Sequence, residues 1–209
     1  MLIQDIMQRD LVTVNVDVRL ADAYKIMQDN GIRHLPVMSG GELVGIVTDR
    51  DLRLATSALT STPFPPDCDV EGVMNQPVQT ADPLDPVETA ARTMRESKFG
   101  CLPVLDNGKL AGIVTGIDLL DALIRLTGVD KPSGRLDIRL QDHPGELARL
   151  THFISERHVN IHSILTYREG GEDLRAVLRI GSMETRPLAQ ALSEHGFKIL
   201  WPPAKPWSN

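Results

Sequence analysis

The sequence predicts a mixed α/β (α+β) fold: two copies of one small unit related by pseudo-twofold symmetry, followed by a separate βαββαβ sandwich. The first observation is a repeat at an offset of 67 residues, in which 15 of the 48 residues of 5–52 recur in 72–119 without a gap. Chance at ordinary residue frequencies would give about 3. The second is that Gly45–Asp51 (GIVTDRD) returns as Gly112–Asp118 (GIVTGID). The third is that the pattern changes after Gly128, which indicates a tandem duplication with an appended domain.

The first unit is predicted to run strand, helix, strand, strand, helix. Its first helix carries an apolar stripe at helical spacing, has Asp17 as its expected N-cap and ends at Gly31. Leu52 and Leu59 are expected on the apolar side of the last helix. The expected strands are 11–14, 33–38 and 43–47, with a tight turn at 40–41, and the last helix begins at Thr48.

The second unit repeats this order, with Asp85 as N-cap, Pro86 at the first helical position and Glu88 at the third. Two helices on a three-stranded sheet leave one sheet face uncovered. The two units are therefore expected to cover each other and to leave a cleft along the pseudo-twofold axis. The proline-rich segment between them is expected to be a stiff linker.

The last part of the chain reads as a ferredoxin-like sandwich. A helix with Leu147, Leu150, Phe153 and Ile154 inward follows its first strand, and Gly170-Gly171 is the expected hairpin turn. The expected strands are 135–140, 160–168, 174–180 and 197–201, with a second helix over 187–195. The expected domain limits are 1–60, 61–70 (linker), 71–128, 129–134 (linker), 135–201 and 202–209 (tail).

Composition favours a cytoplasmic protein without a nucleic-acid or membrane partner. The net charge of −6 opposes binding to nucleic acid or to an anionic lipid surface. Two cysteines are too few for a disulfide framework, and neither a signal peptide nor a membrane-length apolar run is present. No P-loop, dinucleotide fingerprint or nucleophile elbow occurs, and the histidines lack metal-ligand spacing. The protein is therefore predicted to be no enzyme and to hold no metal.

The repeated strand-to-helix corners carry the candidate chemistry. Thr48 and Thr115 fall where a helix N-cap would lie, and Asp51 and Asp118 follow three residues later. A helix start presents free N–H groups to a phosphate, and a carboxylate one turn later can accept hydrogen bonds from both hydroxyls of a ribose. A Thr-x-x-Asp pair is also a plain capping box, which stabilises a helix start by about 1 kcal/mol. Both interpretations can hold at once.

The two corners differ in charge. Arg33, His34 and Arg50 lie near the strand ends of the first copy, whereas the second copy has Gly100, Cys101 and Ile117 there. Because phosphate binding on an acidic protein needs basic side chains, the first copy is expected to favour phosphates. The second copy, with Lys98 as its nearest base, is expected to suit a neutral or less charged ligand, or none. The alternative for the two arginines is a solvated surface. Cys101 lies in an apolar strand and is expected to be a buried small hydrophobe.

Both units resemble the CBS domain, on the Leu-Pro-Val strands at 35–37 and 102–104 and the two Gly-x-x-Thr-x-x-Asp ends. The resemblance implies a regulatory ligand of the adenosine type (AMP, ADP, ATP or S-adenosylmethionine), no catalytic cofactor, and a homodimer. It assigns the ribose contact to the two aspartates and the adenine slot to the strands. The candidate ligand-binding residues are Thr48, Asp51, Thr115, Asp118, Arg33, His34, Arg50, Val12, Thr13, Val14, Pro36, Thr80, Cys101 and Pro103.

Residues 135–201 resemble the ACT domain, on Asp142–Leu147 (DHPGEL) and Asn160-Ile161. The resemblance implies a dimer contact or an amino-acid site, with Asp142, Gly145 and Asn160 as candidates, although Asp142 can also be a helix cap. The whole order is similar to the acetoin-utilisation accessory family, which implies a role in acetoin or butanediol metabolism and an unidentified target enzyme. A ligand-independent interaction scaffold and an amino-acid sensor remain the alternatives to a nucleotide sensor.

Overall fold

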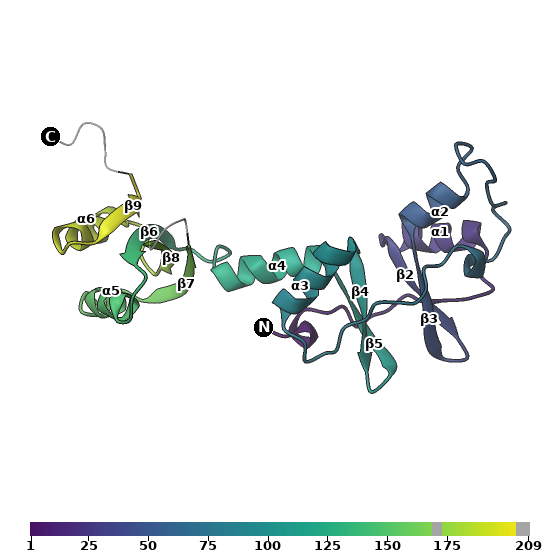
Figure 1. The fold of residues 1–209 in the computed structure, drawn as a ribbon, viewed down its shortest axis with the longest axis horizontal. Helices are drawn as coiled ribbons and strands as arrows, with labels where there is room; N and C mark the ends of the chain where they lie inside the picture. The colour runs from purple at the N-terminus through teal and green to yellow at the C-terminus, as the bar shows by residue number, and fades with distance from the viewer. Residues whose placement is uncertain (169–172, 204–209) are drawn as a thin grey trace. The chain divides into compact units, whose positions relative to one another are not determined.

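The computed structural model describes residues 1–168 and 173–203 and divides the chain into two compact units, Met1–Ala122 and Leu123–Asn209 (Figure 1). Helix α4 (Gly116–Thr127) spans the division. The expected turn at Gly170-Gly171 and the last six residues of the expected tail lie outside the described residues. Within 1–168 and 173–203, no helix has the length and hydrophobicity that a membrane crossing needs.

The first repeat forms a three-stranded sheet in the order β1-β2-β3, with β1 parallel to β2 and β2 antiparallel to β3. Gly40 and Gly41, both at positive φ, form the predicted tight turn between β2 and β3. Gly31 (φ +64°) follows α1 as expected. The elements are η1 (Ile3–Asp5), β1 (Val14–Asn15), α1 (Leu20–Asp29), β2 (His34–Ser39), β3 (Glu42–Thr48) and α2 (Asp49–Ala55).

Three expectations for the first repeat are wrong. The strand expected over 11–14 is reduced to the two-residue β1, and Asp17 caps no helix. The backbone oxygens of Val16 and Val18 accept hydrogen bonds from residues 71 and 70, which keeps the chain extended and delays α1 to Leu20. Leu59 is 97% exposed because α2 ends at Ala55.

The second repeat keeps the antiparallel pair β4-β5, but its first strand is reduced to an isolated bridge between Ala81 and Val104. Helix α3 begins at Val87 and has no side-chain cap. Pro86 is therefore the N-cap residue and Glu88 the second helical residue, so their expected first and third helical positions are wrong. The Asp85 carboxylate accepts a hydrogen bond from the backbone N–H of Asp82 (2.9 Å), so the expected Asp85 cap is wrong. The elements are η2 (Val70–Gly72), α3 (Val87–Ser97), β4 (Cys101–Asp106), β5 (Lys109–Thr115) and α4.

The two repeats exchange the segments that precede them. Ile3 and Met7 lie in the core of the second repeat with Val87, whereas Val70 lies in the core of the first with Leu35. Backbone hydrogen bonds run in both directions between Gln8 and Ile113 and between Asn75 and Ile46. Each repeat is therefore completed by the chain that leads into the other, which binds the pair into one unit.

The C-terminal compact unit, Leu123–Asn209, is a sandwich of two helices and one sheet. The strand order is β7-β8-β6-β9, and all neighbouring strands are antiparallel. Alternate residues of β6 and β8, among them Leu136, Ile138 and Leu178, pack with Leu150 and Leu192 of the helices. The predicted βαββαβ order is therefore confirmed. The elements are β6 (Gly134–Gln141), α5 (Glu146–Ser155), β7 (Ile161–Arg168), β8 (Asp173–Ile180), α6 (Arg186–Glu194) and β9 (Lys198–Trp201).

Helix α5 buries Leu150, Phe153 and Ile154 as predicted. Leu147 is 39% exposed, so its expected inward position is wrong. The helix begins at Glu146 after Gly145, which places Leu147 in the first turn, before the stripe that faces the sheet.

Candidate functional site

The first strand-to-helix corner is a complete capping box. Oδ2 of Asp51 accepts hydrogen bonds from the backbone N–H of Thr48 (2.9 Å) and from its hydroxyl (2.7 Å). The Thr48 hydroxyl in turn accepts from the backbone N–H of Asp51 (3.1 Å). The helix-stabilising interpretation of Thr-x-x-Asp is thus confirmed here, and it orients the carboxylate for any further partner.

The second corner has the same geometry. Oδ2 of Asp118 accepts from the Thr115 backbone N–H and hydroxyl, both at 2.7 Å, and the Asp118 backbone N–H donates to the Thr115 hydroxyl at 3.4 Å. Asp118 is 8% exposed. The sequence therefore predicted both corners correctly as local structures.

Each carboxylate also takes an amide from the exchanged segment. Asn75 donates Nδ2–H to Oδ2 of Asp51 (2.8 Å), and Gln8 donates Nε2–H to Oδ1 of Asp118 (2.9 Å). All three donors to Asp51 thus converge on one oxygen, and Oδ1 accepts no hydrogen bond from any described residue. The sequence reasoning missed both amides, although Gln8 and Asn75 are one repeat offset apart and each follows a methionine.

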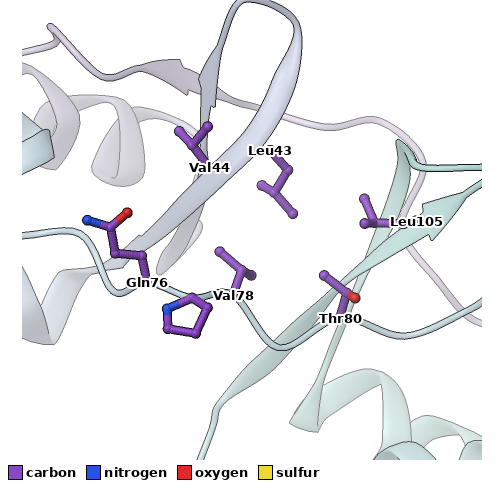
Figure 2. A pocket seen from close by; sticks show the side chains of 7 residues that line it. Leu43, Val44, Gln76, Val78, Thr80 and Leu105 are labelled. Carbon is purple, nitrogen blue, oxygen red and sulfur yellow. The ribbon is translucent and has the colours of Figure 1, made fainter.

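Strand β3 has the first corner at its end and borders a pocket near its start. Gly45 and Val47 are buried on one face of the strand, whereas Val44, Ile46 and Thr48 lie half-buried on the other. Val44 lines a pocket of about 610 Å³, a size typical of small-molecule sites (Figure 2). The pocket is lined by Leu43, Val44, Gln76, Pro77, Val78, Thr80 and Leu105.

A second segment also contributes to both places. Asn75 bonds to Asp51 at the corner, and the next residue, Gln76, lines the pocket. Its apolar walls come from both repeats: Val44 lies on β3 and Leu105 on β4. Among the residues predicted from the sequence, Thr80 lies in this lining. Gln76, Pro77 and Val78 were missed because their irregular segment carries no periodicity that marks it as a pocket wall. The remaining lining residues lie on β3 and β4 and were not among the predicted site residues.

The basic residues of the first copy surround its corner. Arg33 and Arg50 are exposed, and the Arg33 carbonyl accepts a hydrogen bond from the Asp49 N–H (3.1 Å). His34 is half-buried, and burial together with the Arg33 charge lowers its pKa below the usual value. A Cβ on Gly100 would lie 2.7 Å from Nε2 of His34, so glycine allows the close approach of that ring.

The predicted adenine-slot residues divide by exposure. Cys101 is buried, as expected of a small hydrophobe, and burial raises the pKa of its thiol to about 12. The exposure of the other members varies: Val12 is half-buried and Thr13 is exposed, whereas Pro36 and Pro103 are buried. Val14 is also buried, at 5% exposure. Their contact with a ligand stays a prediction.

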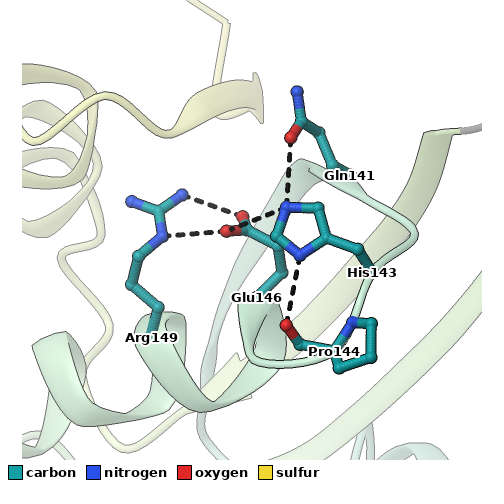
Figure 3. Close-up of polar contacts among 5 residues, drawn as sticks. All are labelled: Gln141, His143, Pro144, Glu146 and Arg149. Atoms are coloured by element: carbon teal, nitrogen blue, oxygen red, sulfur yellow. Dashed lines mark hydrogen bonds and ion pairs between the residues drawn. The ribbon is translucent and has the colours of Figure 1, made fainter.

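The loop before α5 in the C-terminal unit is held by polar contacts among its own residues and those of α5. His143 Nε2 lies 3.1 Å from Oε1 of Gln141, and Arg149 donates to both carboxylate oxygens of Glu146 (Figure 3). Gly145 is the N-cap residue at φ +98°, a conformation that favours glycine.

Asp142 does not cap α5. Its carboxylate accepts a hydrogen bond from Arg168 of β7 (2.6 Å). The Asn160 carbonyl accepts from the Gly181 N–H (2.8 Å), and its side chain has no partner among the described residues. An amino-acid site at these residues stays a prediction. Over the described ranges, no group of three or more His, Cys, Asp or Glu side chains is placed to hold a metal ion.

Comparison with known protein families gives two matches. The CBS domain family matches residues 3–57 and 70–125, and the ACT domain family matches residues 134–196. A CBS domain-containing protein of Dictyostelium discoideum is 41% identical over 138 residues, which cover 60% of this chain and 92% of that protein. A homoserine O-acetyltransferase of Methanosalsum zhilinae is 37% identical over 124 residues, but these cover 58% of this chain and only 24% of the enzyme.

Solved structures resemble the same part of the chain. The CBS domain pair of protein MJ0100, in complex with 5′-methylthioadenosine and S-adenosyl-L-methionine, is 28% identical with a TM-score of 0.54, covering 63% of this chain and 98% of that one. CBSX2 in complex with AMP is 27% identical with a TM-score of 0.54, covering 60% and 97%. An acetoin utilization protein (AcuB) from Vibrio cholerae is 30% identical with a TM-score of 0.54, covering 62% and 95%.

Proposed function

Because the chain belongs to the CBS domain family and carries a C-terminal ACT domain, we propose that it is a non-catalytic regulatory protein that binds an adenine nucleotide in its CBS pair. The observation that carries the proposal is the Asp51 carboxylate, held by a capping box with Oδ1 open to a further donor within the described structure. AMP, S-adenosylmethionine and 5′-methylthioadenosine in the solved relatives all contain adenosine, which supports this ligand class.

Each part of such a ligand has a matching group. A ribose diol can donate to Asp51, and such a charge-assisted hydrogen bond contributes about 1.5–3 kcal/mol. Arg33 and Arg50 are exposed cations near the same corner and suit a phosphate. We propose that the adenine ring lies against the strand residues that the sequence predicts for it, such as Val14 and Pro36.

Regulation then follows from differential affinity. The corner takes Asp51 from the first repeat and Asn75 from the segment before the second, so a ligand there interacts with both parts of the pair. A ligand that binds one arrangement of the repeats more tightly shifts the population toward it. In this proposal the protein is a homodimer that passes the shift to a target enzyme, with the ACT domain as a dimer contact or a second ligand site.

We also propose a metabolic role, on the basis of one of the similar structures. The likeness to the acetoin utilization protein of Vibrio cholerae supports a role in acetoin or butanediol metabolism. Growth of a deletion strain on acetoin as carbon source tests this part: slowed growth on acetoin alone supports it, and unchanged growth refutes it.

Calorimetric titration with ATP, ADP, AMP and S-adenosylmethionine tests the ligand. At least one is expected to bind the wild type, and Asp51→Asn is expected to weaken that binding about tenfold to a hundredfold. Asp22→Asn, which removes an exposed carboxylate from α1, is the matched control and leaves binding unchanged. No heat with any of the four, or equal affinity in Asp51→Asn, would contradict the proposal. Stabilisation by an amino acid that Gly145→Val abolishes would instead favour the amino-acid sensor.

A further inference from the structure

The two corners of the CBS pair have the same sequence motif but offer different chemistry to a ligand. At the first corner, the three side-chain and backbone donors all bond to Oδ2 of Asp51, and no described residue donates to Oδ1. At the second corner, Oδ2 of Asp118 takes the Thr115 donors and Oδ1 takes the amide of Gln8. Asp118 is also buried at 8% exposure.

The backbone of Gln8 is fixed by its own hydrogen bonds and by the packing of the preceding residue, Met7. Backbone hydrogen bonds of 2.9 and 3.0 Å join Gln8 to Ile113 in both directions. Met7 packs against Gly112, where an added Cβ would lie 3.0 Å from the Met7 Cγ and 3.0 Å from the Gln8 carbonyl oxygen. A diol that needs Oδ1 of Asp118 must therefore displace a side chain whose backbone is fixed.

Asn75 is related to Gln8 by the repeat, but its shorter side chain reaches the carboxylate differently. Its amide bonds to the oxygen that the capping box already uses, 2.8 Å from Oδ2. The two amides thus have opposite effects: Asn75 adds a third donor to an occupied oxygen, and Gln8 fills the remaining one. A carboxylate that faces a ribose needs an oxygen that accepts from the hydroxyls.

The two corners also differ in the number of basic residues near them, and this difference again favours the first corner. Arg33 and Arg50 of the first corner are replaced by Gly100 and Ile117 at the second. Lys98, two residues before Gly100, is the nearest basic residue of the second copy along the chain, so fewer cations there offset the repulsion that a phosphate meets on a chain of net charge −6. Hydrogen-bond occupancy, burial and charge therefore all favour the first corner.

We propose, resting on the proposed function above, that Gln8 closes the second corner and that each chain binds a single phosphate-bearing adenine nucleotide, at Asp51. Gln8 is in this view the residue that determines how many corners are open. The geometry also predicts that shortening the Gln8 side chain opens the second corner to an adenine ligand without a phosphate, because Arg33 and Arg50 have no counterparts in the second copy.

The experiment is calorimetric stoichiometry on the full chain, with AMP and with adenosine as probes. The wild type is expected to bind one AMP per chain; Asp51→Asn weakens it about tenfold or more, and Asp118→Asn leaves it unchanged. Gln8→Ala is expected to add a second binding event for adenosine while the AMP event stays as in the wild type. Gln4→Ala is the matched control: the same truncation in the same segment, at an amide that bonds to no described residue, adds none.

Several results would overturn the inference. Two AMP per chain in the wild type, or binding that Asp118→Asn removes and Asp51→Asn does not, would show that Gln8 does not close the second corner. No second event for adenosine in a folded Gln8→Ala variant would do the same. Two AMP per chain, or no second adenosine event in Gln8→Ala, leaves the proposed function intact. AMP binding that Asp51→Asn does not weaken, or the absence of any nucleotide binding in the wild type, refutes both. Far-UV circular dichroism confirms that each variant is folded.

Discussion

Replacement of Gly45 by alanine tests the exchange of segments between the two repeats. An added Cβ would overlap Sδ of Met74 and lie 2.8 Å from its Cγ and 3.1 Å from its Cβ, where ordinary contacts begin near 3.4 Å. The Met74 tail can rotate, but its Cβ is fixed because the next residue, Asn75, pairs with Ile46 in both directions. The close contact therefore cannot be relieved by side-chain rotation alone.

The expected cost follows from two opposing terms. Overpacking of this kind costs about 1–3 kcal/mol. Removing a glycine restricts the unfolded chain and returns about 0.4–1 kcal/mol. The net destabilisation of Gly45→Ala is therefore about 0–2.6 kcal/mol, to be measured by urea denaturation followed by circular dichroism.

A double-mutant cycle with Met74→Ala identifies the cause. In that background the Sδ and Cγ contacts are gone and only the 3.1 Å contact with the Cβ of residue 74 remains, so Gly45→Ala is expected to cost clearly less than in the wild type. Gly116→Ala is the control, because a Cβ there meets nothing closer than 4.0 Å. A penalty for Gly45→Ala that is the same in the wild type and in the Met74→Ala background would refute the packing of segment 69–75 on the first repeat.

Three further predictions concern titratable groups. Burial alone would raise the pKa of Asp137, but hydrogen bonds from its two arginines outweigh burial and lower it. Its stabilising effect is therefore full above pH 4 and is lost as the pH falls through the folded-state pKa; Asp137→Asn should cost about 2–4 kcal/mol at pH 7 and flatten the acid limb of a denaturation series. The lowered pKa of His34 means that the unfolded state binds more protons below about pH 6.5, so stability should fall from pH 7.5 to 5.5, and less in His34→Gln; an equal fall in both would contradict this. Cys101, with a pKa raised to about 12, should resist a thiol reagent at pH 8 that modifies the half-buried Cys68; equal rates would contradict its burial.

Much of the local structure followed from sequence patterns. The Thr-x-x-Asp pairs formed the expected capping boxes because both partners lie within one helical turn. The Gly40-Gly41 turn and the antiparallel strands around it also formed as predicted, since two glycines allow the positive φ angles such a turn needs. The apolar stripe of α5 was correct from Leu150 onward.

Interactions between distant segments were not predictable in the same way. A 67-residue offset shows that two segments are equivalent, but it does not say on which copy each one packs, because Met7 and Met74 fit either core equally well. The amides of Gln8 and Asn75 were missed for this reason. The expected Asp17 and Asp85 caps failed because tertiary hydrogen bonds, from Val70 to Val18 and from Ile3 to Asp85, fixed the backbone there first.

The most direct test of the proposed site is a crystal structure of the protein grown with AMP. The account predicts one AMP per chain, with a ribose hydroxyl about 2.6–3.0 Å from Oδ1 of Asp51 and the phosphate beside Arg33 or Arg50. AMP bound with its ribose on Asp118, or away from both aspartates, would contradict it.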